Sequence, residues 1–274
     1  MSYSLATEKI LLSDIQKSLI SSREDIYKHF HTTKAQWIKF SQKVSDPTRE
    51  GIWVFLVACG YALGELEGIK KLTEILTESG LEQSNNPKIW FESIPISPRS
   101  GKDEGKTHFD LSLGAIVNRD RTENGIKFNT QAPSWVCLCE AKIDSDISPN
   151  VTYDPTRNQL IRIIENAICF QDFGTYTDKV FVTIITPEKA FKNKRPLLEK
   201  KFEQYRSNPK SISDEIQACI SDRNLRSDWK YPDDLEQRIK ALRLKRVYFE
   251  DLLQNLPESK VSGRIKKLWI NLSM

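Results

Sequence analysis

The 274-residue chain lacks a hydrophobic stretch long enough to cross a bilayer. Its most apolar segment, residues 51–64, covers about 14 positions, whereas a transmembrane helix needs about 20. No basic stretch followed by an apolar one marks a secretion signal. The five cysteines are an odd number without the regular spacing of a disulfide framework. We therefore expect a soluble cytoplasmic protein with free cysteines, most of them in its core.

Motifs of several common enzyme classes are also absent. There is no glycine-rich phosphate loop and no Gly-x-Ser-x-Gly segment, which argues against nucleotide-loop hydrolases and against serine hydrolases of the elbow type. Cys137-x-Cys139 has no second pair at zinc-site spacing. His29 and His31 lack a cysteine or carboxylate partner nearby. We therefore read Cys137 and Cys139 as buried thiols.

Positive charge is concentrated in the last third of the chain. Residues 1–185 hold 21 Lys and Arg against 24 Asp and Glu, whereas residues 186–274 hold 20 against 13. Aromatic residues alternate with this charge at 205–206, 229–231 and 243–248. Such a surface is suited to phosphate contacts and base stacking, although an exposed helical face has the same composition.

The first 80 residues have the pattern of helices. Thr7 is suited to cap the first of two helical pieces within residues 7–44, and packing on a main domain is the simplest role for the pair. Asp46-Pro47 is a helix start, and the helix that follows contains the apolar run 52–58. We expect this helix to be buried and kinked near Gly60 or Gly64.

From residue 88 onward the pattern changes to that of an α/β fold. We expect three strands, a helix that begins at Pro155, and a fourth, central strand. The basic C-terminal part is expected to be mainly helical, with a last strand at 264–272. The four predicted strands are 89–96, 108–117, 135–142 and 180–185, and the C-terminal helices are 195–205, 212–220 and 233–256.

One of five Glu/Asp-x-Lys tripeptides stands apart. The copies that begin at 104, 228 and 258 fall in predicted loops, and the copy at 199 lies on a charged helix. Only Glu140-Ala-Lys142 ends an apolar strand, follows a strand that carries an aspartate, and precedes a helix. Context therefore selects this copy as a candidate active site.

Strand geometry makes the copy at 140 chemically plausible. Glu140 and Lys142 share one strand face, because side chains alternate along a strand. If the strand at 108–117 pairs with this one, Asp110 lies beside Glu140. Two adjacent carboxylates repel each other and form an oxygen-rich site for Mg²⁺. Lys142 would then orient the water nucleophile and stabilise charge on a phosphorane-like transition state. His108, two residues from Asp110, either contacts a phosphate or simply packs.

The pattern Asp110…Glu140-Ala-Lys142 within strand, strand, helix, strand resembles the PD-(D/E)XK nucleases. Phe109 stands where the family name has proline, and 29 residues separate Asp110 from Glu140. The resemblance implies a restriction-endonuclease-like core at 47–190, with a helical extension at 1–46 and a basic region at 191–274. It also implies an acid on the preceding helix, for which Glu65 is the first candidate and Glu67 and Glu50 the alternatives. Polar residues for the phosphate backbone would come from the first turns of the following helix, namely Arg157, Asn158, Gln159 and Arg162.

The resemblance further implies a type II restriction endonuclease that cuts double-stranded DNA as a homodimer, with Mg²⁺, or Mn²⁺ in its place, at Asp110 and Glu140. A second hypothesis is a nuclease of the same fold with another task, such as a defence effector, a mobile-element end-cutting subunit, or a repair or RNA nuclease. A third is a nucleic-acid-binding module without catalysis, which has no need of clustered carboxylates.

Overall fold

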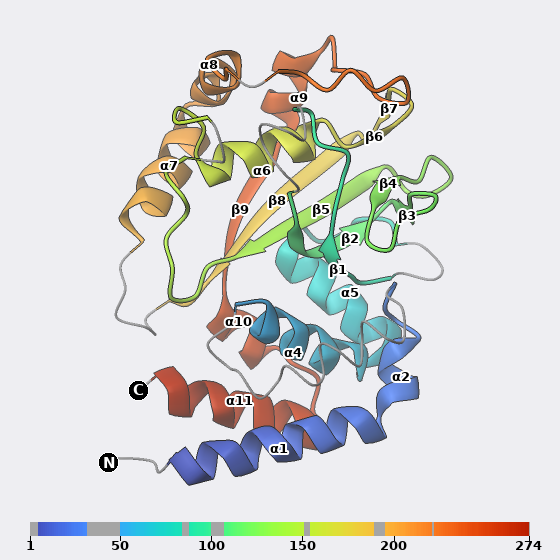
Figure 1. Ribbon diagram of the computed structural model, residues 1–274. Coiled ribbons are helices and arrows are strands. Elements are labelled where there is room, and N and C mark those ends of the chain that lie inside the picture. The colour runs from blue at the N-terminus through green and yellow to red at the C-terminus, as the bar shows by residue number, and fades with distance from the viewer. Residues whose placement is uncertain are drawn as a thin grey trace.

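The protein is a mixed α/β structure built on one five-stranded sheet (Figure 1). The computed structural model describes residues 5–31, 50–83, 88–99, 107–150, 154–188, 195–220 and 222–273. The spatial order of the sheet is β1-β2-β5-β8-β9. The strands are β1 (Trp90–Ser93), β2 (Phe109–Gly114), β5 (Trp135–Ala141), β8 (Lys179–Thr186) and β9 (Arg243–Tyr248).

The sheet combines antiparallel and parallel pairing. β2 is antiparallel to both β1 and β5, whereas β5, β8 and β9 run parallel to one another. β5 and the following β8 are joined through α6 (Gln159–Ile168), as a parallel pair requires. All seven residues of β5 are buried, because helices cover both of its faces.

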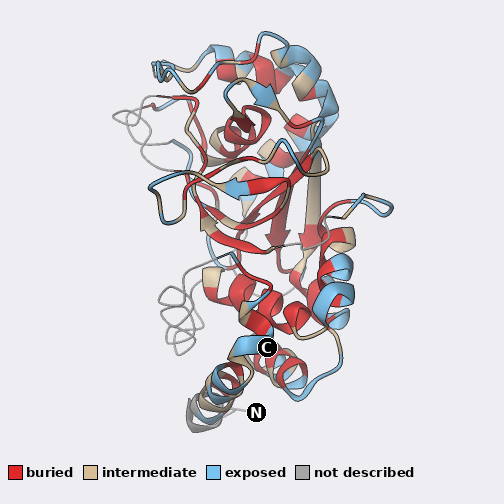
Figure 2. Ribbon diagram, turned by 90° about the vertical axis from the view of Figure 1, so that its right-hand side faces the viewer, coloured by how far each residue is buried: buried red, intermediate tan, exposed pale blue. Residues whose placement is uncertain are grey.

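Helices pack on both faces of the sheet and generate two cores (Figure 2). Cys137, Cys139 and Ala141 face one core, and Val136 and Leu138 face the other, as the alternation along this strand predicted. The first core holds α1 (Leu5–Ser21), α2 (Arg23–Tyr27), α4 (Glu50–Ala62), α5 (Glu65–Leu76), α10 (Phe249–Gln254) and α11 (Lys260–Ser273). The second holds α6, α7 (Pro196–Ser207), α8 (Lys210–Gln217) and α9 (Leu235–Ala241).

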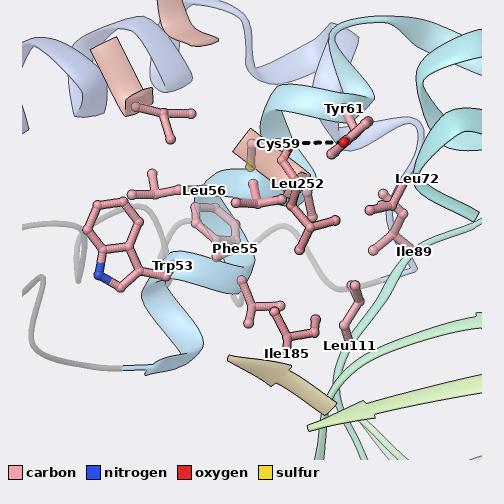
Figure 3. Packing of buried hydrophobic residues seen from close by; sticks show 14 of the residues in the cluster. Trp53, Phe55, Leu56, Cys59, Tyr61, Leu72, Ile89, Leu111, Ile185 and Leu252 are labelled. Atoms are coloured by element: carbon pink, nitrogen blue, oxygen red, sulfur yellow. Dashed lines mark hydrogen bonds between the residues drawn. The ribbon is translucent and has the colours of Figure 1, made fainter. Parts of the chain in front are cut away.

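α4 is the central helix of the first core. Eleven of its residues, from Ile52 to Ala62, are buried, and its side chains pack between the sheet and α10 and α11 (Figure 3). Trp53 meets Trp269 of α11 edge to face, with ring centroids 4.8 Å apart. The buried hydroxyl of Tyr61 donates to the carbonyl of Leu252 at 2.9 Å. The expected burial of 52–58 is confirmed, and the expected break falls at Gly64, between α4 and α5.

The long connection between β2 and β5 is itself folded. β3 (Ile116–Asn118) and β4 (Ile126–Phe128) form an antiparallel hairpin. The hairpin is tied to the chain after β1, because the N–H of Ile126 donates to the carbonyl of Ile94 at 2.9 Å. A smaller hairpin, β6 (Gln171–Asp172) with β7 (Thr175–Tyr176), follows α6. The 29 residues between Asp110 and Glu140 therefore leave both strands free to pair directly.

Four predictions about the elements are wrong. Residues 243–248 form β9, not part of a long helix, and residues 260–273 form α11, not a strand. The region 191–274 thus supplies a strand of the central sheet. The following helix starts at Gln159 instead of Pro155, since Asn158 caps it by accepting from the N–H of Ile161 at 3.1 Å. The apolar spacing of residues 69–76, with Gly80 as a C-cap, predicts a helix that ends at Gly80, but α5 ends earlier, at Leu76.

The Asp46-Pro47 helix start and the second helical piece after residue 31 lie outside the described residues. Among the helices that the structure describes, none has both the length and the apolar character needed to cross a membrane.

Candidate active site

The candidate site lies at the carboxyl end of β5, where the strand leaves the sheet. Glu140 is the penultimate residue of β5 and Lys142 follows the strand directly. The N–H of Lys142 donates to the carbonyl of Ile185 on β8 at 2.9 Å, so the backbone still follows the sheet at this point. Both residues are buried: 5% of the surface of Glu140 and 7% of the surface of Lys142 is exposed to solvent.

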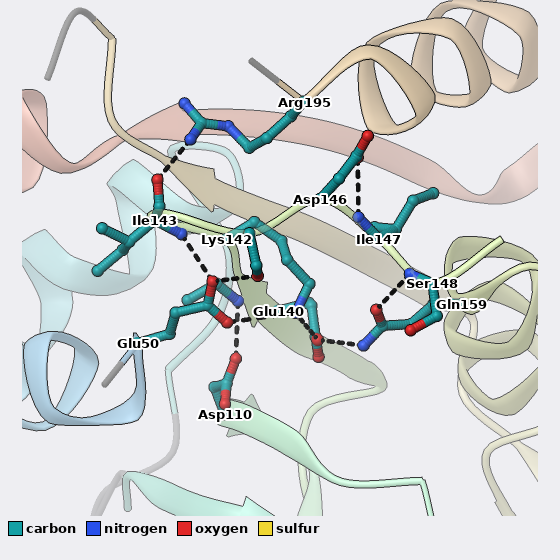
Figure 4. Close-up of polar contacts among 12 residues, drawn as sticks. Glu50, Asp110, Glu140, Lys142, Ile143, Asp146, Ile147, Ser148, Gln159 and Arg195 are labelled. Carbon is teal, nitrogen blue, oxygen red and sulfur yellow. Dashed lines mark hydrogen bonds and ion pairs between the residues drawn. The ribbon is translucent and has the colours of Figure 1, made fainter. Parts of the chain in front are cut away.

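Asp110 lies opposite Glu140 on the neighbouring strand. The β2–β5 register pairs Leu111 with Cys139 and Ser112 with Leu138, and one further step places Asp110 opposite Glu140. A carboxylate oxygen of Asp110 accepts from the N–H of Ala141 at 2.7 Å (Figure 4). The expected pairing of the two strands is confirmed.

Lys142 joins the two sides of the site. Its Nζ lies 2.9 Å from Oε1 of Glu140 and 3.3 Å from Oε2 of Glu50 (Figure 4). Burial by itself lowers the pKa of a lysine, but Glu140 and Glu50 outweigh it and raise the pKa of Lys142 above its ordinary value. Lys142 is therefore a cation at neutral pH, which favours the orienting and electrostatic role over that of a base.

Glu50, the first residue of α4, is the helix acid at this site. Its Oε1 accepts from the N–H of Ile143 at 3.0 Å and from the hydroxyl of Ser145 at 2.7 Å. The carboxylate thus fixes the segment that follows β5 as well as Lys142.

Glu65, the first choice from the sequence, is placed elsewhere. It begins α5 with a positive φ of 53°, and its exposed carboxylate pairs with Lys28 at 3.1 Å. Glu67 is exposed on the same turn. The preference for Glu65 is therefore corrected to Glu50, which the sequence offered only as an alternative.

Gln159, at the start of α6, reaches the site from the second core. Its amide Nε2 donates to Oε1 of Glu140 at 2.8 Å, the same oxygen that Lys142 contacts. Its backbone N–H and its Oε1 both bond to the backbone of Ser148. Gln159 therefore positions the glutamate. Arg162, one turn later, is near enough to lower the pKa of Glu140.

Arg157 and Asn158 do not face a ligand. Arg157 is fully buried and forms an ion pair with Glu165 at 2.6 Å. Asn158 is also buried, caps α6, and donates to the hydroxyl of Tyr205 at 2.8 Å. Their expected contact with a phosphate backbone is replaced by structural roles.

His108 is half exposed, and its Nδ1 lies 3.6 Å from the carboxylate of Glu92.

The two carboxylates are poorly stabilised by the protein alone. Burial and the neighbouring Glu140 raise the pKa of Asp110 well above its ordinary value, and burial followed by Glu50 raises that of Glu140 despite Lys142. Within the described residues, Oδ1 of Asp110 and Oε2 of Glu140 accept no hydrogen bond. A hard divalent cation would satisfy both oxygens and remove the repulsion.

The donor set is small. In the described part of the chain, no three His, Cys, Asp or Glu side chains come together as a metal site. Asp110 and Glu140 thus offer two protein ligands, and Mg²⁺ commonly retains several waters and is completed by substrate phosphate oxygens. The residues fit a magnesium ion of this kind.

Two supporting residues, Asp146 and Arg195, were not predicted from the sequence. Asp146 follows the Glu-x-Lys tripeptide closely, and Arg195 borders a loop. The carboxylate of Asp146 accepts from the N–H groups of Leu197 and Leu198 at 2.8 and 2.9 Å and so caps the first turn of α7. The guanidinium of Arg195 donates to the carbonyl of Ile143 (Figure 4). The polar residues directly after the motif were a signal for Asp146, whereas no pattern marked Arg195.

No family model matches this chain, and neither the curated proteins nor the solved structures include a match. The likeness to the PD-(D/E)XK nucleases therefore rests on the site residues and their arrangement alone.

Proposed function

We propose that the protein is a Mg²⁺-dependent endodeoxyribonuclease with a PD-(D/E)XK-type site, and that it acts as a type II restriction endonuclease. The observation that carries the proposal is the opposition of Asp110 and Glu140 across two strands, with Lys142 between Glu140 and Glu50. A structural ion pair needs one carboxylate for one lysine. Here Lys142 has two carboxylate partners, and a third carboxylate stands beside Glu140.

The residues divide the work of phosphodiester hydrolysis. When bound, Mg²⁺ supplies a Lewis acid for the scissile phosphate and lowers the pKa of a bound water. Asp110 and Glu140 would hold that ion. The charged Lys142 orients the attacking water and stabilises negative charge on the phosphate in the transition state. Glu50 and Gln159 fix Lys142 and Glu140, because each bonds to one of them directly.

A plasmid-cleavage assay with Mg²⁺ tests the proposal. We expect wild-type protein to cut, and Asp110→Asn and Lys142→Ala to lose roughly a hundredfold or more of the rate. The matched control is Glu258→Gln with Lys260→Gln, which removes an exposed copy of the same tripeptide and should leave cutting unchanged. Circular dichroism confirms that each variant is folded.

The pattern of products separates the alternatives. Discrete fragments with uniform ends support a restriction endonuclease. Degradation to a smear, or cleavage of RNA alone, supports a nuclease of the same kind with another task. Absence of cleavage of both DNA and RNA with Mg²⁺ and with Mn²⁺ overturns the proposed chemistry.

A further inference from the structure

A pocket of about 340 Å³ lies at the opposite end of the sheet from the candidate active site. α7, α8 and α9 surround it together with the amino ends of β8 and β9, in the upper part of Figure 1. Phe181 of β8 lines the pocket, whereas Ile185, four residues later, pairs with Ala141 beside the active site. At about 3.3 Å per residue, the two sites are about 13 Å apart along the strand.

The floor of this pocket is apolar and firmly packed. Phe181, Tyr205, Ile212 and Ile239 line it, and each is at most 3% exposed. These side chains belong to the cores and cannot move without disturbing them. Leu242 and Leu244 also line the pocket and are only partly buried, so they leave apolar surface against which an aromatic or apolar group can pack.

The rim of the pocket is basic. It carries four cations, Arg206, Lys240, Arg243 and Lys245, against one carboxylate, Glu78. Glu78 already pairs with Lys179 at 3.1 Å. Lys245 donates to the carbonyl of Thr77 at 2.6 Å, which fixes the ammonium without neutralising it.

Two of these cations are available for a ligand. Within the described residues, Arg243 donates only to the carbonyl of Ala241, at 3.4 Å, and neither Arg243 nor Lys240 contacts a carboxylate. Both side chains are exposed. The pocket thus combines uncompensated positive charge at its mouth with an apolar floor, which matches a small anionic ligand better than the open face of a duplex.

We propose that this pocket is a second binding site that takes a nucleotide-sized ligand, with its phosphates on Lys240 and Arg243 and its base against the apolar floor. Arginine and lysine bind phosphate through charge-assisted hydrogen bonds. The volume lies near the lower end of the range for small-molecule sites, and it limits the occupant to about one nucleotide. The inference stands independently of the nuclease chemistry at Glu140.

Isothermal titration with ATP, AMP and adenosine at low salt and in EDTA tests the site. We expect ATP to bind most tightly and adenosine least, since phosphate contacts carry much of the affinity. Lys240→Gln with Arg243→Gln should weaken ATP binding roughly tenfold or more, because two charge-assisted contacts are lost. Lys230→Gln with Lys260→Gln removes the same charge elsewhere and should leave the affinity unchanged.

A further variant tests whether the ligand binds in the pocket or at the candidate active site. Asp110→Asn with Glu140→Gln should retain ATP binding, which places the nucleotide away from the candidate active site. The proposal is overturned if wild-type protein binds neither ATP nor AMP, if both charge-removing double variants behave alike, or if the Lys240 and Arg243 changes weaken only duplex DNA binding. Thermal unfolding of each variant confirms that the fold is intact.

Discussion

Glu50 and Lys142 are 92 positions apart in the chain, yet Oε2 of one lies 3.3 Å from Nζ of the other. This contact joins the start of the buried helix α4 to the end of the central strand β5. Glu50 also accepts from the N–H of Ile143, so one carboxylate holds both the lysine and the backbone beside it.

The choice between the two helix acids leads to the first prediction. Glu50→Gln should lower the rate of DNA cleavage roughly 10- to 100-fold, because the amide holds Lys142 and the segment after β5 less well. Glu65→Gln is the matched control, and it should cut at the wild-type rate, since Glu65 is exposed and its one ion pair within the described residues is with Lys28. Equal effects of the two substitutions on initial cleavage rates would contradict the site as described.

Metal binding should be visible in stability before any cleavage is measured. We expect Mg²⁺ in excess of its dissociation constant to raise the melting temperature of wild-type protein by about 3 °C, because the ion binds only the folded site. Asp110→Asn should abolish this increase. The readout is differential scanning calorimetry with Mg²⁺ and with EDTA.

The same variant has a second signature. In EDTA, Asp110→Asn should be at least as stable as wild type, because asparagine still accepts from the N–H of Ala141 but no longer repels Glu140. A loss of several kcal/mol in urea unfolding would show instead that Asp110 serves the fold.

A pH effect on stability is expected at Asp154, whose carboxylate accepts hydrogen bonds from Thr156, Cys219 and Ile220. Burial opposes its charge, but hydrogen bonds from Cys219, Thr156 and Ile220 outweigh burial and lower the pKa of Asp154 to about 2. The unfolded value is about 3.9, so the ionised form stabilises the fold above pH 4, and this contribution is lost as the pH falls toward 2.

Asp154→Asn makes that effect measurable. At pH 7 the variant should lose about 2 kcal/mol of unfolding free energy. The difference from wild type should shrink as the pH falls from 4 to 2 in a series of urea titrations. A difference that does not depend on pH would assign the loss to packing instead of ionisation.

Arg157 provides a test of a structural role where the sequence predicted a binding one. It is buried against Glu165, which also pairs with Arg99 at 2.8 Å. Arg157→Ala should cost about 3 kcal/mol or more in unfolding free energy, because a buried charge loses a partner. At a temperature where both proteins are folded, DNA affinity should match wild type. A weakened affinity in folded protein would restore the binding role.

The sequence predicted the placement of the three central residues well, because side-chain alternation along a strand follows a simple rule. Asp110, Glu140 and Lys142 came from one strand pattern, and the register places them as expected. The helix acid could not be assigned in the same way. Glu50 and Glu65 lie at opposite ends of one apolar run, and only the turn at Gly64 and the packing of α4 decide which end meets β5.

The C-terminal errors have a similar origin. Leu235, Ile239 and Leu242 have helical spacing, and no glycine or proline between 235 and 256 marks a break. β9 nevertheless forms there, because it extends the sheet at the free edge of β8. Residues 264–272 have the repeat of a helix and not the alternation of the predicted strand. Ile265, Leu268 and Trp269 are buried and Ile270 is 54% exposed, which is a helical pattern.

The position of Glu50 also bears on the order in which activity appears during folding. α4 has almost no polar face, so it gains a stable place only when the sheet on one side and α10 and α11 on the other are assembled. α10 and α11 come from the end of the chain. A partly folded molecule that already contains Glu50 therefore does not yet hold this carboxylate beside Lys142, and the contact between the two forms only when α10 and α11 have docked on α4.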